Sequence, residues 1–428
     1  MKLSIEKAVY GGDGLGRGAG GRVMFVPFTI PGEVVEVSAA EESGSSASAE
    51  LVQIDVASPD RVKAKCKHFG RCGGCQYQHA EYRSQIEMKT DILSETMERM
   101  GLRDRPQMTI HTGNPWGYRN RIRLRVESVQ ETIRFGYNLR DTREFLPIEE
   151  CPIAAPVLWK TAQALLHLSK TEPTCAQWLR AAAEVELFTR PDEQSLQMTL
   201  MLRLERSARF VEFCEKVKLG VGEVVGVGAE MGGGGGRRRP EIASWGKGGL
   251  RYVVEDKAHW VTRGGFFQVN RFLVGELVRV VTEGRKGLIA WDLFAGVGLF
   301  SRVLADSFEQ VVAVEANPMA MRDLEAAKVA NIRGFAVSVV DYLREAVVGR
   351  ERPDLVVMDP PRAGAGAEVC GLLARMQVPQ IVYVSCDPTT LARDLRMMVD
   401  SGYNLAELHL VDLFPQTFHL ETVAVLQR

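Results

Sequence analysis

The sequence lacks the two features that would direct a protein to or across a membrane. No apolar run among its 428 residues is long enough to span a bilayer, and the N-terminus lacks the basic-then-apolar pattern of a secretory signal. We therefore expect a cytoplasmic protein without membrane segments. The chain also has almost no net charge, because 53 Lys and Arg residues balance 54 Asp and Glu residues. The resulting charge of −1 neither favours nor excludes a nucleic-acid partner.

Cysteine is scarce, with eight residues in the whole chain. In a reducing cytoplasm such cysteines more often ligate a metal or take part in catalysis than form disulfides. A hydrophobic content of 46% and a charged fraction of 25% are typical of a globular protein. The length exceeds one ordinary domain, so we expect two or three domains, in a monomer.

Positive charge is concentrated in one segment, residues 61–125, which holds fourteen Lys and Arg against six Asp and Glu. Such a segment is typical of a nucleic-acid footprint, although a solvated basic face has the same composition. Within it Arg119, Arg121, Arg123 and Arg125 alternate with apolar residues and so share one face of a predicted strand. RNA backbone is the preferred explanation of what covers this face, and carboxylates of the same protein are the alternative.

The first two thirds of the chain predict two domains. Residues 1–58 show short apolar alternations separated by glycine turns, which indicate a small β-barrel that binds RNA or, alternatively, a structural β extension. Residues 59–257 indicate a central α+β domain. Its helix over 80–100 ends at Gly101, and we expect this helix to pack on the C-terminal domain. The segment Gly232–Arg239 reads as a disordered surface insertion.

Three cysteines of the central region are clustered with metal-ligand spacing. Cys66, Cys72 and Cys75 follow the pattern C-x₅-C-x₂-C, and Cys151, beside a proline, is the best fourth ligand. A set of four cysteines fits either an iron–sulfur cluster or structural zinc, and the spacing leaves both open. His68 and His79 could replace a cysteine, but histidines in such loops more often form hydrogen bonds nearby.

From residue 258 to 428 apolar runs alternate with helical patterns, which predicts a doubly wound parallel sheet. The runs are 288–294, 311–314, 335–340, 355–358, 381–384 and 423–426. The first run closes on a small-residue turn containing Phe294 and Gly296, Glu315 ends the second, and Asp341 follows the third. A glycine turn followed by acids at successive strand ends indicates an adenosine cofactor.

Three further residues of this domain indicate a specific reaction. Asp359 follows the fourth run in Asp-Pro-Pro-Arg, Cys386 follows the fifth in Ser-Cys-Asp-Pro, and Glu421 begins the last. Addition of a thiolate to C6 of uracil makes C5 nucleophilic enough to accept a methyl group, and a base must then remove the C5 proton. Cys386 fits the nucleophile and Glu421 the base, whereas a buried structural cysteine is the alternative reading of Cys386.

The chain as a whole resembles the RNA uracil-C5 methyltransferases, most closely the 23S ribosomal RNA type with a TRAM domain and an iron–sulfur cluster. The resemblance rests on motifs from both halves of the sequence: Pro31-Gly32-Glu33, Cys72-Gly-Gly-Cys75, residues 265–270 (GFFQVN), residues 292–296 (DLFAG), residues 359–362 (DPPR), residues 385–388 (SCDP) and residues 419–422 (HLET).

The resemblance implies a Rossmann-like class I methyltransferase domain behind an OB-like TRAM barrel and a central domain that carries the cluster. It implies a [4Fe-4S] cluster on Cys66, Cys72, Cys75 and Cys151, and transfer of a methyl group from S-adenosylmethionine to uridine C5 in RNA. It assigns Cys386 as nucleophile and Glu421 as base. The residues implied to contact the cofactor or the uracil are Gln268, Phe294, Gly296, Glu315, Asp341 and Asp359.

Three alternatives remain from the sequence. An RNA 5-methylcytosine enzyme would need a second cysteine beside the Asp-Pro-Pro turn, and Cys370 lies too far along the chain. A transfer-RNA substrate would use the same catalytic core. A non-catalytic RNA-binding or assembly factor would not need Cys386, Asp359 and Glu421 together.

Overall fold

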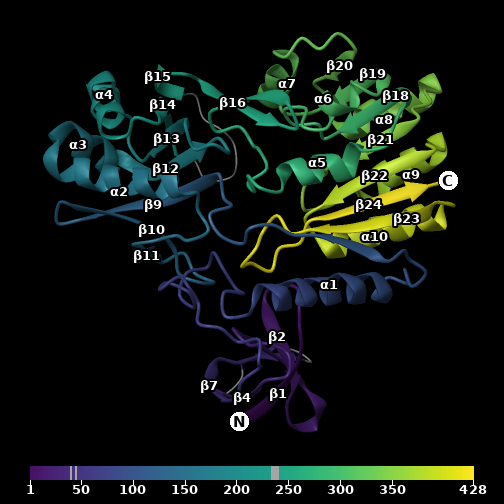
Figure 1. Cartoon of the computed structure of the whole chain (residues 1–428), viewed down its shortest axis with the longest axis horizontal. Coiled ribbons are helices and arrows are strands. Elements are labelled where there is room, and N and C mark those ends of the chain that lie inside the picture. The colour runs from purple at the N-terminus through teal and green to yellow at the C-terminus, as the bar shows by residue number, and fades with distance from the viewer. Residues whose placement is uncertain (39–40, 44–45, 233–240) are drawn as a thin grey trace.

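The computed structural model describes residues 1–38, 41–43, 46–232 and 241–428, which form three lobes (Figure 1). A small β lobe lies at the bottom of that view, a mixed lobe at the upper left, and the C-terminal α/β lobe at the right. The insertion expected at Gly232–Arg239 falls almost wholly outside the described residues. In the described part of the chain, every helix is too short or too polar to cross a membrane.

The N-terminal lobe consists of seven strands around one small apolar core. Leu3, Ile5, Val26 and Val35 are fully buried in it, because alternate side chains of these short strands point inward. The sheet order is β5-β6-β3-β2-β1-β4-β7. The bounds are β1 (Lys2–Ala8), β2 (Asp13–Arg17), β3 (Val23–Pro27), β4 (Val34–Val37), β5 (Glu41–Ser43), β6 (Ser46–Ser48) and β7 (Leu51–Val56).

A buried ion pair closes this lobe. The Glu33 carboxylate is fully buried, and it accepts hydrogen bonds from the guanidinium of Arg61 at 2.5 and 2.8 Å and from the backbone N–H of Ile30. This bidentate contact lowers the pKa of Glu33 against the opposing effect of burial. It explains physically why a glutamate after Pro31-Gly32 and an arginine at 61 occur together.

The central lobe is a seven-stranded sheet covered on one face by three helices. Its order is β11-β10-β9-β12-β13-β14-β15, and its core includes Leu124, Trp178 and Phe213. The strands are β9 (Arg121–Val129), β10 (Thr132–Asn138), β11 (Phe145–Pro147), β12 (Ala182–Thr189), β13 (Leu196–Leu202), β14 (Val224–Met231) and β15 (Glu241–Gly246), and the helices are α2 (Pro156–Thr171), α3 (Pro173–Ala181) and α4 (Phe210–Gly220).

The C-terminal lobe confirms the predicted α/β fold. Its eight strands have the order β20-β19-β18-β21-β22-β24-β23-β8, and the first five of these run parallel. The strands are β8 (Met108–His111), β18 (Gly287–Leu293), β19 (Phe308–Val314), β20 (Ile332–Phe335), β21 (Leu355–Met358), β22 (Gln380–Ser385), β23 (Asn404–Val411) and β24 (Thr422–Gln427), and the helices are α5 (Val274–Thr282), α6 (Ser301–Leu304), α7 (Pro318–Glu325), α8 (Val339–Gly349), α9 (Gly366–Met376) and α10 (Pro388–Asp400).

Two parts of the prediction for this sheet were incomplete. The apolar run at 335–340 is not one strand, because β20 ends at Phe335 and α8 begins at Val339 after the N-cap Ser338. The sheet is also not wholly parallel: β24 pairs antiparallel with β22 and with β23.

The hairpin of β16 (Gly249–Val254) and β17 (Lys257–Thr262) shares its hydrophobic core with α5 and this sheet.

The helix expected over 80–100 is α1 (Tyr82–Arg99), and it joins the lobes. In Figure 1 it lies between the N-terminal lobe and α10. Leu93 and Met97 are fully buried in the core of the C-terminal lobe, as expected. The helix stops at Gly101, whose φ of +80° is the left-handed conformation that favours glycine at this position.

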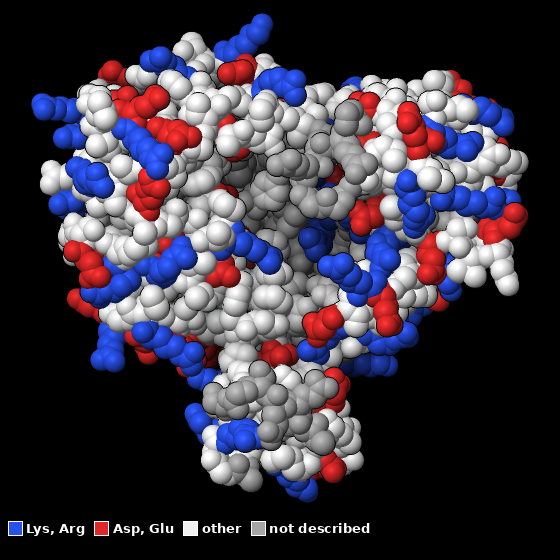
Figure 2. Space-filling model, turned by 180° about the vertical axis from the view of Figure 1, so that it is seen from behind, with Lys and Arg blue, Asp and Glu red and all other residues white. Residues whose placement is uncertain are grey.

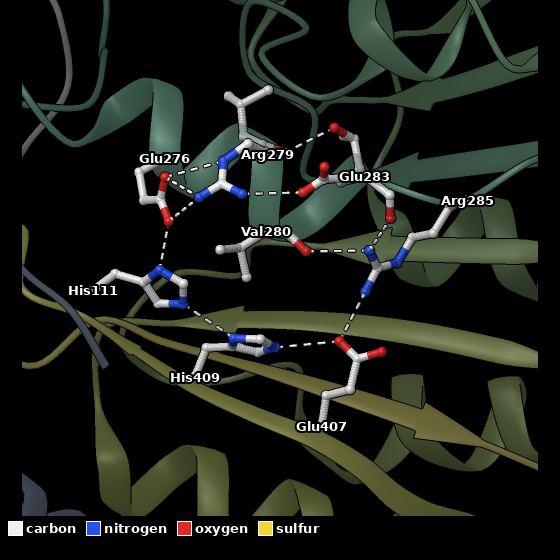
Figure 3. Close-up of polar contacts among 10 residues, drawn as sticks. His111, Glu276, Arg279, Val280, Glu283, Arg285, Glu407 and His409 are labelled. Carbon is white, nitrogen blue, oxygen red and sulfur yellow. Dashed lines mark hydrogen bonds and ion pairs between the residues drawn. The ribbon is translucent and has the colours of Figure 1, made fainter. Parts of the chain in front are cut away.

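A chain of polar contacts fixes the edge strand β8 to the sheet and to α5 (Figure 3). The imidazole of His111 on β8 contacts Glu276 of α5 at 2.5 Å and His409 of β23 at 3.1 Å. His409 in turn contacts Glu407 at 3.2 Å, which pairs with Arg285. These side chains hold three elements that are distant in sequence at one sheet edge.

Candidate functional site

The first part of the site is the turn after β18, at the carboxyl end of the parallel sheet. Phe294 has a φ of +63°, a strained conformation for a residue with a bulky side chain. The turn is held by Glu315 after β19, whose carboxylate accepts a hydrogen bond from the Gly296 N–H at 2.9 Å. Phe294, Gly296 and Glu315, which the sequence singled out, therefore lie together at two adjacent strand ends.

The buried carboxyl of Asp292 supports the same turn from below. One of its oxygens accepts hydrogen bonds from the N–H and the hydroxyl of Ser301, at 2.9 and 2.5 Å. Burial raises the pKa of Asp292 to about 7, although the bonds from Ser301 lower it. The sequence pattern assigns Asp292 no role of its own, because the burial of this carboxyl depends on the packing of α6.

A second group of side chains gathers after β21. The amide of Gln268 donates a hydrogen bond to the Asp359 carboxyl at 3.3 Å. Burial, and next the neighbouring Asp292, raise the pKa of Asp359 to about 7. The segment carrying Gln268 thus meets the Asp-Pro-Pro turn, which brings two sequence-predicted residues together from regions far apart in the chain.

Cys386 lies at the next strand end, in the turn between β22 and α10. Asp387 caps α10 by accepting hydrogen bonds from the N–H groups of Thr389 and Thr390, both at 3.0 Å. The thiol is half-buried. Burial raises its pKa to about 11; among its neighbours Glu421 raises the pKa further and Arg362 lowers it.

Glu421 is buried beside these groups, immediately before β24. Its exposed fraction is 3%, and burial followed by the proximity of Asp359 raises its pKa well above the usual range. Arg362 acts in the opposite direction. Cys386 therefore lies close enough to Glu421 and Asp359 for their charges to affect its pKa, and Asp359 affects the pKa of Glu421 in the same way.

Arg362 and His419 belong to this site although the sequence analysis gave them no role. The Arg362 guanidinium lies 3.4 Å from the His419 ring, and its charge acts on both Cys386 and Glu421. Burial lowers the pKa of His419 to about 4. The position of Arg362 directly after the Asp-Pro-Pro turn was the available signal.

Asp341 is the exception among the cofactor candidates. It lies in the first turn of α8, where its N–H donates to Ser338 at 3.1 Å and its carboxylate contacts the same hydroxyl at 2.6 Å. The side chain is exposed and pairs with Arg344 at 3.5 Å. Its described contacts are with its own helix, not with Glu315 or Gly296.

Cys370, the cysteine nearest along the chain to the Asp-Pro-Pro turn, lies outside the site. It is 2% exposed within the core between α8, α9 and the sheet. Burial raises the pKa of its thiol to about 12.

The four cysteines of the central region line one cavity of about 480 Å³. Burial raises the pKa of Cys75 to about 12 and that of Cys151 to about 11, and the neighbouring thiols contribute to both shifts. Among the described residues, however, no group of three or more histidine, cysteine or acidic side chains could hold a metal ion. The geometry of the described residues therefore gives no support to a bound metal or cluster.

The two histidines near this cavity have other partners. Nε2 of His68 accepts a hydrogen bond from the Glu149 N–H at 2.9 Å. His79 is buried and packs on the ring of Phe69, with 5.5 Å between ring centres.

The arginine-rich strand is covered mainly by the protein's own groups. Arg121 and Arg123 pair with Glu186 at 3.2 and 2.8 Å, and Arg125 donates to the Asn138 side chain at 2.7 Å. RNA is therefore not needed to explain this face, which corrects the preferred interpretation of the pattern. Arg119, Arg121 and Arg123 all line the cysteine cavity. The buried Nε of Arg119 has no hydrogen-bond partner among the described residues.

The surface carries charges of both signs. Figure 2 shows lysine and arginine side chains on both sides of the middle of that face, above the N-terminal lobe, with acidic side chains among them. The fold thus presents separate basic groups and no single uniformly basic face in this view.

Comparison with known proteins identifies the family. The sequence model described as tRNA (Uracil-5-)-methyltransferase matches residues 260–428. An RNA methyltransferase of Aquifex aeolicus is 32% identical, over 100% of this chain and 98% of its own length. The 23S rRNA (uracil(1939)-C(5))-methyltransferase RlmD of Chromohalobacter salexigens is 30% identical, over 100% of this chain and 89% of its own length.

A solved structure has the same fold. The tRNA (uracil-54, C5)-methyltransferase of Pyrococcus abyssi, in complex with S-adenosyl-L-homocysteine, aligns over 100% of both chains with a TM-score of 0.78 and 24% identity. The relatives that match the full chain and the family model that matches residues 260–428 are all methyltransferases, as the residues at the sheet edge suggested. The chain belongs to the S-adenosylmethionine-dependent RNA uracil-C5 methyltransferases.

Proposed function

We propose that this enzyme methylates C5 of a uridine in 23S ribosomal RNA through a covalent adduct between Cys386 and C6 of the uracil, with Glu421 as base. The observation that carries the proposal is the convergence of the Cys386 thiol with the Glu421 and Asp359 carboxyls beside Arg362. Methylation at a ring nitrogen would require no thiol at this position.

In this mechanism the Cys386 thiolate adds to C6, and the electrons of the C5–C6 double bond shift toward C5 and the O4 carbonyl. Bound S-adenosylmethionine supplies an electrophilic methyl group, which C5 takes as the methyl–sulfur bond breaks. Glu421 then removes the C5 proton, the electrons of that bond re-form the double bond, and the thiolate leaves. A raised pKa makes the Glu421 carboxylate a stronger base for this step.

Gln268 and Asp359 are proposed to hold the flat polar edge of the uracil. Their mutual hydrogen bond at 3.3 Å places an amide and a carboxyl side by side. With a pKa of about 7, Asp359 can donate or accept a hydrogen bond near neutral pH. The target base must leave its stack to reach groups that are this deeply buried.

Phe294, Gly296, Glu315 and Asp341 are proposed to hold S-adenosylmethionine. Glu315 stands at the strand end where an acid can accept hydrogen bonds from ribose hydroxyls. The Glu315 carboxylate already accepts a hydrogen bond from the Gly296 N–H, so this one side chain would position both the turn and the cofactor. Asp341 is the least supported of the four, because its carboxylate is engaged with Ser338.

We also propose that the cysteine cavity holds a [4Fe-4S] cluster on Cys66, Cys72, Cys75 and Cys151. A zinc ion would need sulfur atoms about 3.8 Å apart around one point, given a Zn–S bond of roughly 2.3 Å. Cys66, Cys72, Cys75 and Cys151 line one cavity, and four thiolates are the usual ligand set of a [4Fe-4S] cluster. The unpartnered Nε–H of Arg119 on the same cavity suits an anionic group. The four residues would tie the 66–75 loop to the central sheet, a structural role rather than a redox role.

Anaerobic purification tests the cluster. We expect iron–sulfur absorbance and about four irons per chain. Cys151→Ala should lose both, whereas Cys214→Ala, at a cysteine buried in the hydrophobic core of the same lobe, should keep the iron. A colourless protein that contains zinc would overturn the cluster assignment.

The proposed domains follow from these roles: an RNA-binding TRAM-like barrel at 1–58, a central cluster domain at 59–257 and the methyltransferase domain at 258–428. Ribosomal RNA is favoured because the RlmD relatives match the whole chain. Transfer RNA is the second candidate, since the matching family model and the Pyrococcus abyssi enzyme are both named for it. A cytoplasmic location and a monomeric state stay predictions.

The decisive experiment combines adduct trapping with substrate choice. RNA containing 5-fluorouridine should form a covalent adduct with the wild type and none with Cys386→Ser. Glu421→Gln should accumulate a methylated adduct on ordinary uridine RNA, because the C5 proton then stays in place. Labelled methyl transfer to 23S fragments rather than to transfer RNA would identify the substrate. An adduct that survives Cys386→Ser would remove Cys386 from the mechanism, and no methyl transfer at all would favour an assembly factor.

A further inference from the structure

The turn between β1 and β2 brings the N-terminal lobe to the candidate active site. Tyr10 lies between β1 and β2, and its hydroxyl donates a hydrogen bond to the backbone carbonyl of Cys386 at 3.4 Å. The nucleophile and this tyrosine are separated by most of the chain, so the contact depends on how the lobes dock. No other lobe contact reaches the Cys386 turn so directly among the hydrogen bonds of the described residues.

The same tyrosine also contacts the loop that carries the base. Its ring packs edge-on against Phe418, with 5.3 Å between ring centres. Phe418 packs on His419 at 4.2 Å, and His419 lies two residues before Glu421. Tyr10 therefore bridges the nucleophile turn and the base loop.

The docking of this turn leaves little free space. A side chain on Gly12 would meet Gln76 at 2.8 Å and Phe418 at 3.5 Å. The N–H groups of Gln76 and Tyr77 both donate to the Gln416 carbonyl at 3.0 Å, so the 75–77 segment is itself fastened to the base loop. On the other side of the turn, Arg140 contacts Asp13 at 3.4 Å.

The chemistry of the nucleophile turn explains why an outside contact matters. Within the turn, Ser385 donates to the Asp387 carbonyl at 3.1 Å, and Asp387 caps α10. The Cys386 carbonyl, by contrast, is held by Tyr10. The tyrosine remains a hydrogen-bond donor near neutral pH, because burial and the adjacent Asp387 raise its pKa.

We propose that Tyr10 is a positioning residue for the methyl-transfer reaction: it fixes the Cys386 turn against the Phe418–Glu421 loop, so the N-terminal lobe completes the active site in addition to binding RNA. This inference rests on the proposed role of Cys386. It assigns the lobe an effect on the rate of the chemical step, which an RNA tether would not have.

Two substitutions separate the parts of the contact. Tyr10→Phe removes only the hydroxyl, and we expect adduct formation with saturating 5-fluorouridine RNA to slow roughly threefold. Tyr10→Ala also removes the ring, and we expect a loss of about thirtyfold or more, because a small misplacement of a reacting group is costly. In both variants the Kd for RNA should stay within about twofold of the wild type.

The control is Tyr403→Phe, which removes a hydroxyl bonded to the Val378 carbonyl at 3.0 Å, away from the site. It should lower thermal stability as much as Tyr10→Phe or more while leaving the adduct rate unchanged. Weaker RNA binding with a normal saturated rate in the Tyr10 variants would overturn the proposal and make Tyr10 an RNA contact only.

The failure of this proposal is distinguishable from failure of the mechanism. If the wild type forms the adduct, Cys386→Ser does not, and both Tyr10 variants react at the wild-type rate, the positioning role alone is wrong. If the wild type forms no adduct, the Cys386 mechanism itself fails.

Discussion

At the scale of single residues, the reactivity of Cys386 is set by opposing influences. Burial and the Glu421 carboxyl hold its thiol protonated, with a pKa of about 11, and the Arg362 guanidinium favours the thiolate. Because the thiolate is the nucleophile, these neighbours determine how much reactive enzyme is present at a given pH. Arg362 and Asp359 act on both Cys386 and Glu421, so the pKa values of these two groups cannot be tuned independently.

Alkylation of Cys386 by iodoacetamide measures this balance. Below the thiol pKa of about 11, the rate should rise roughly tenfold per pH unit, because the thiolate fraction does. Glu421→Gln removes a negative neighbour, lowers the thiol pKa, and should accelerate alkylation at pH 9. Arg362→Met should slow it. If the two substitutions shift the rate in the same direction, local charge does not control the thiol. Peptide mapping of the labelled cysteine provides the readout.

At the scale of elements, α1 is an amphipathic helix whose buried face includes polar residues. Lys89 is fully buried and contacts Asp412 at 2.5 Å and the Phe414 carbonyl at 3.0 Å. One turn earlier, Gln85 exchanges hydrogen bonds with Gln416 at 3.0 and 3.1 Å. These contacts fasten the loop that leads to Glu421 onto a helix from the N-terminal half of the chain.

The Lys89–Asp412 pair gives an element-scale prediction. Lys89→Met leaves a carboxylate buried without its cation and should reduce the free energy of unfolding by roughly 3–5 kcal/mol. Asp412→Asn should cost a similar amount, and the double variant should cost clearly less than the sum of the two. Urea unfolding of the four proteins completes the cycle. Additive losses would mean that the two side chains do not interact.

At the scale of the whole molecule, buried imidazoles make the fold sensitive to acid. Burial lowers the pKa of His259, which is fully buried, to about 4. The unfolded chain therefore binds more protons than the folded protein between pH 6.5 and 4, and stability falls as pH drops through this range. Burial also lowers the pKa of His409 in the contact chain of Figure 3.

The acid effect is measurable as a difference between variants. Between pH 7 and 4.5 the wild type should lose about 2 kcal/mol more stability than His259→Leu, which has no proton to bind there. His167→Gln, at an exposed position of α2, should keep the wild-type pH dependence. Equal slopes for the wild type and His259→Leu in urea unfolding would show that His259 does not contribute.

Elements that are set by residues close together in the sequence could be predicted, whereas contacts between segments that are distant in the sequence could not. The strands β18, β19, β21 and β22, and α1 with its stop at Gly101, follow from local periodicity and turn chemistry, and they were found, whereas the run predicted at 335–340 overlaps β20 only at Phe335. The pairing of β8 with β23 was not found, because a four-residue strand shows no sign of its partner in its own pattern. Periodicity reports that a side chain is buried but not what covers it, which explains the misread arginine face of β9.

The candidate site divides in the same way. Cys386, Asp359 and Glu315 could be named because each follows a strand whose carboxyl end lies at one sheet edge. Glu421 could be named because it begins the last apolar run of the chain. Arg362, His419 and Tyr10 were missed as participants, since their roles arise from loops and a lobe that meet only in three dimensions. Their contacts with Cys386 and Glu421 carry no local sequence pattern.

The position of β24 has a consequence for synthesis on the ribosome. This strand lies inside the sheet, between β22 and β23, although it is the last of the described strands to be made. β8 emerges early but must wait for β23, and β23 can join the sheet only through β24. The residue directly before β24 is Glu421. A nascent chain can therefore expose the N-terminal lobe, which we propose binds RNA, and Cys386 while it still lacks Glu421. On the proposed mechanism it would bind RNA before it could complete a reaction cycle.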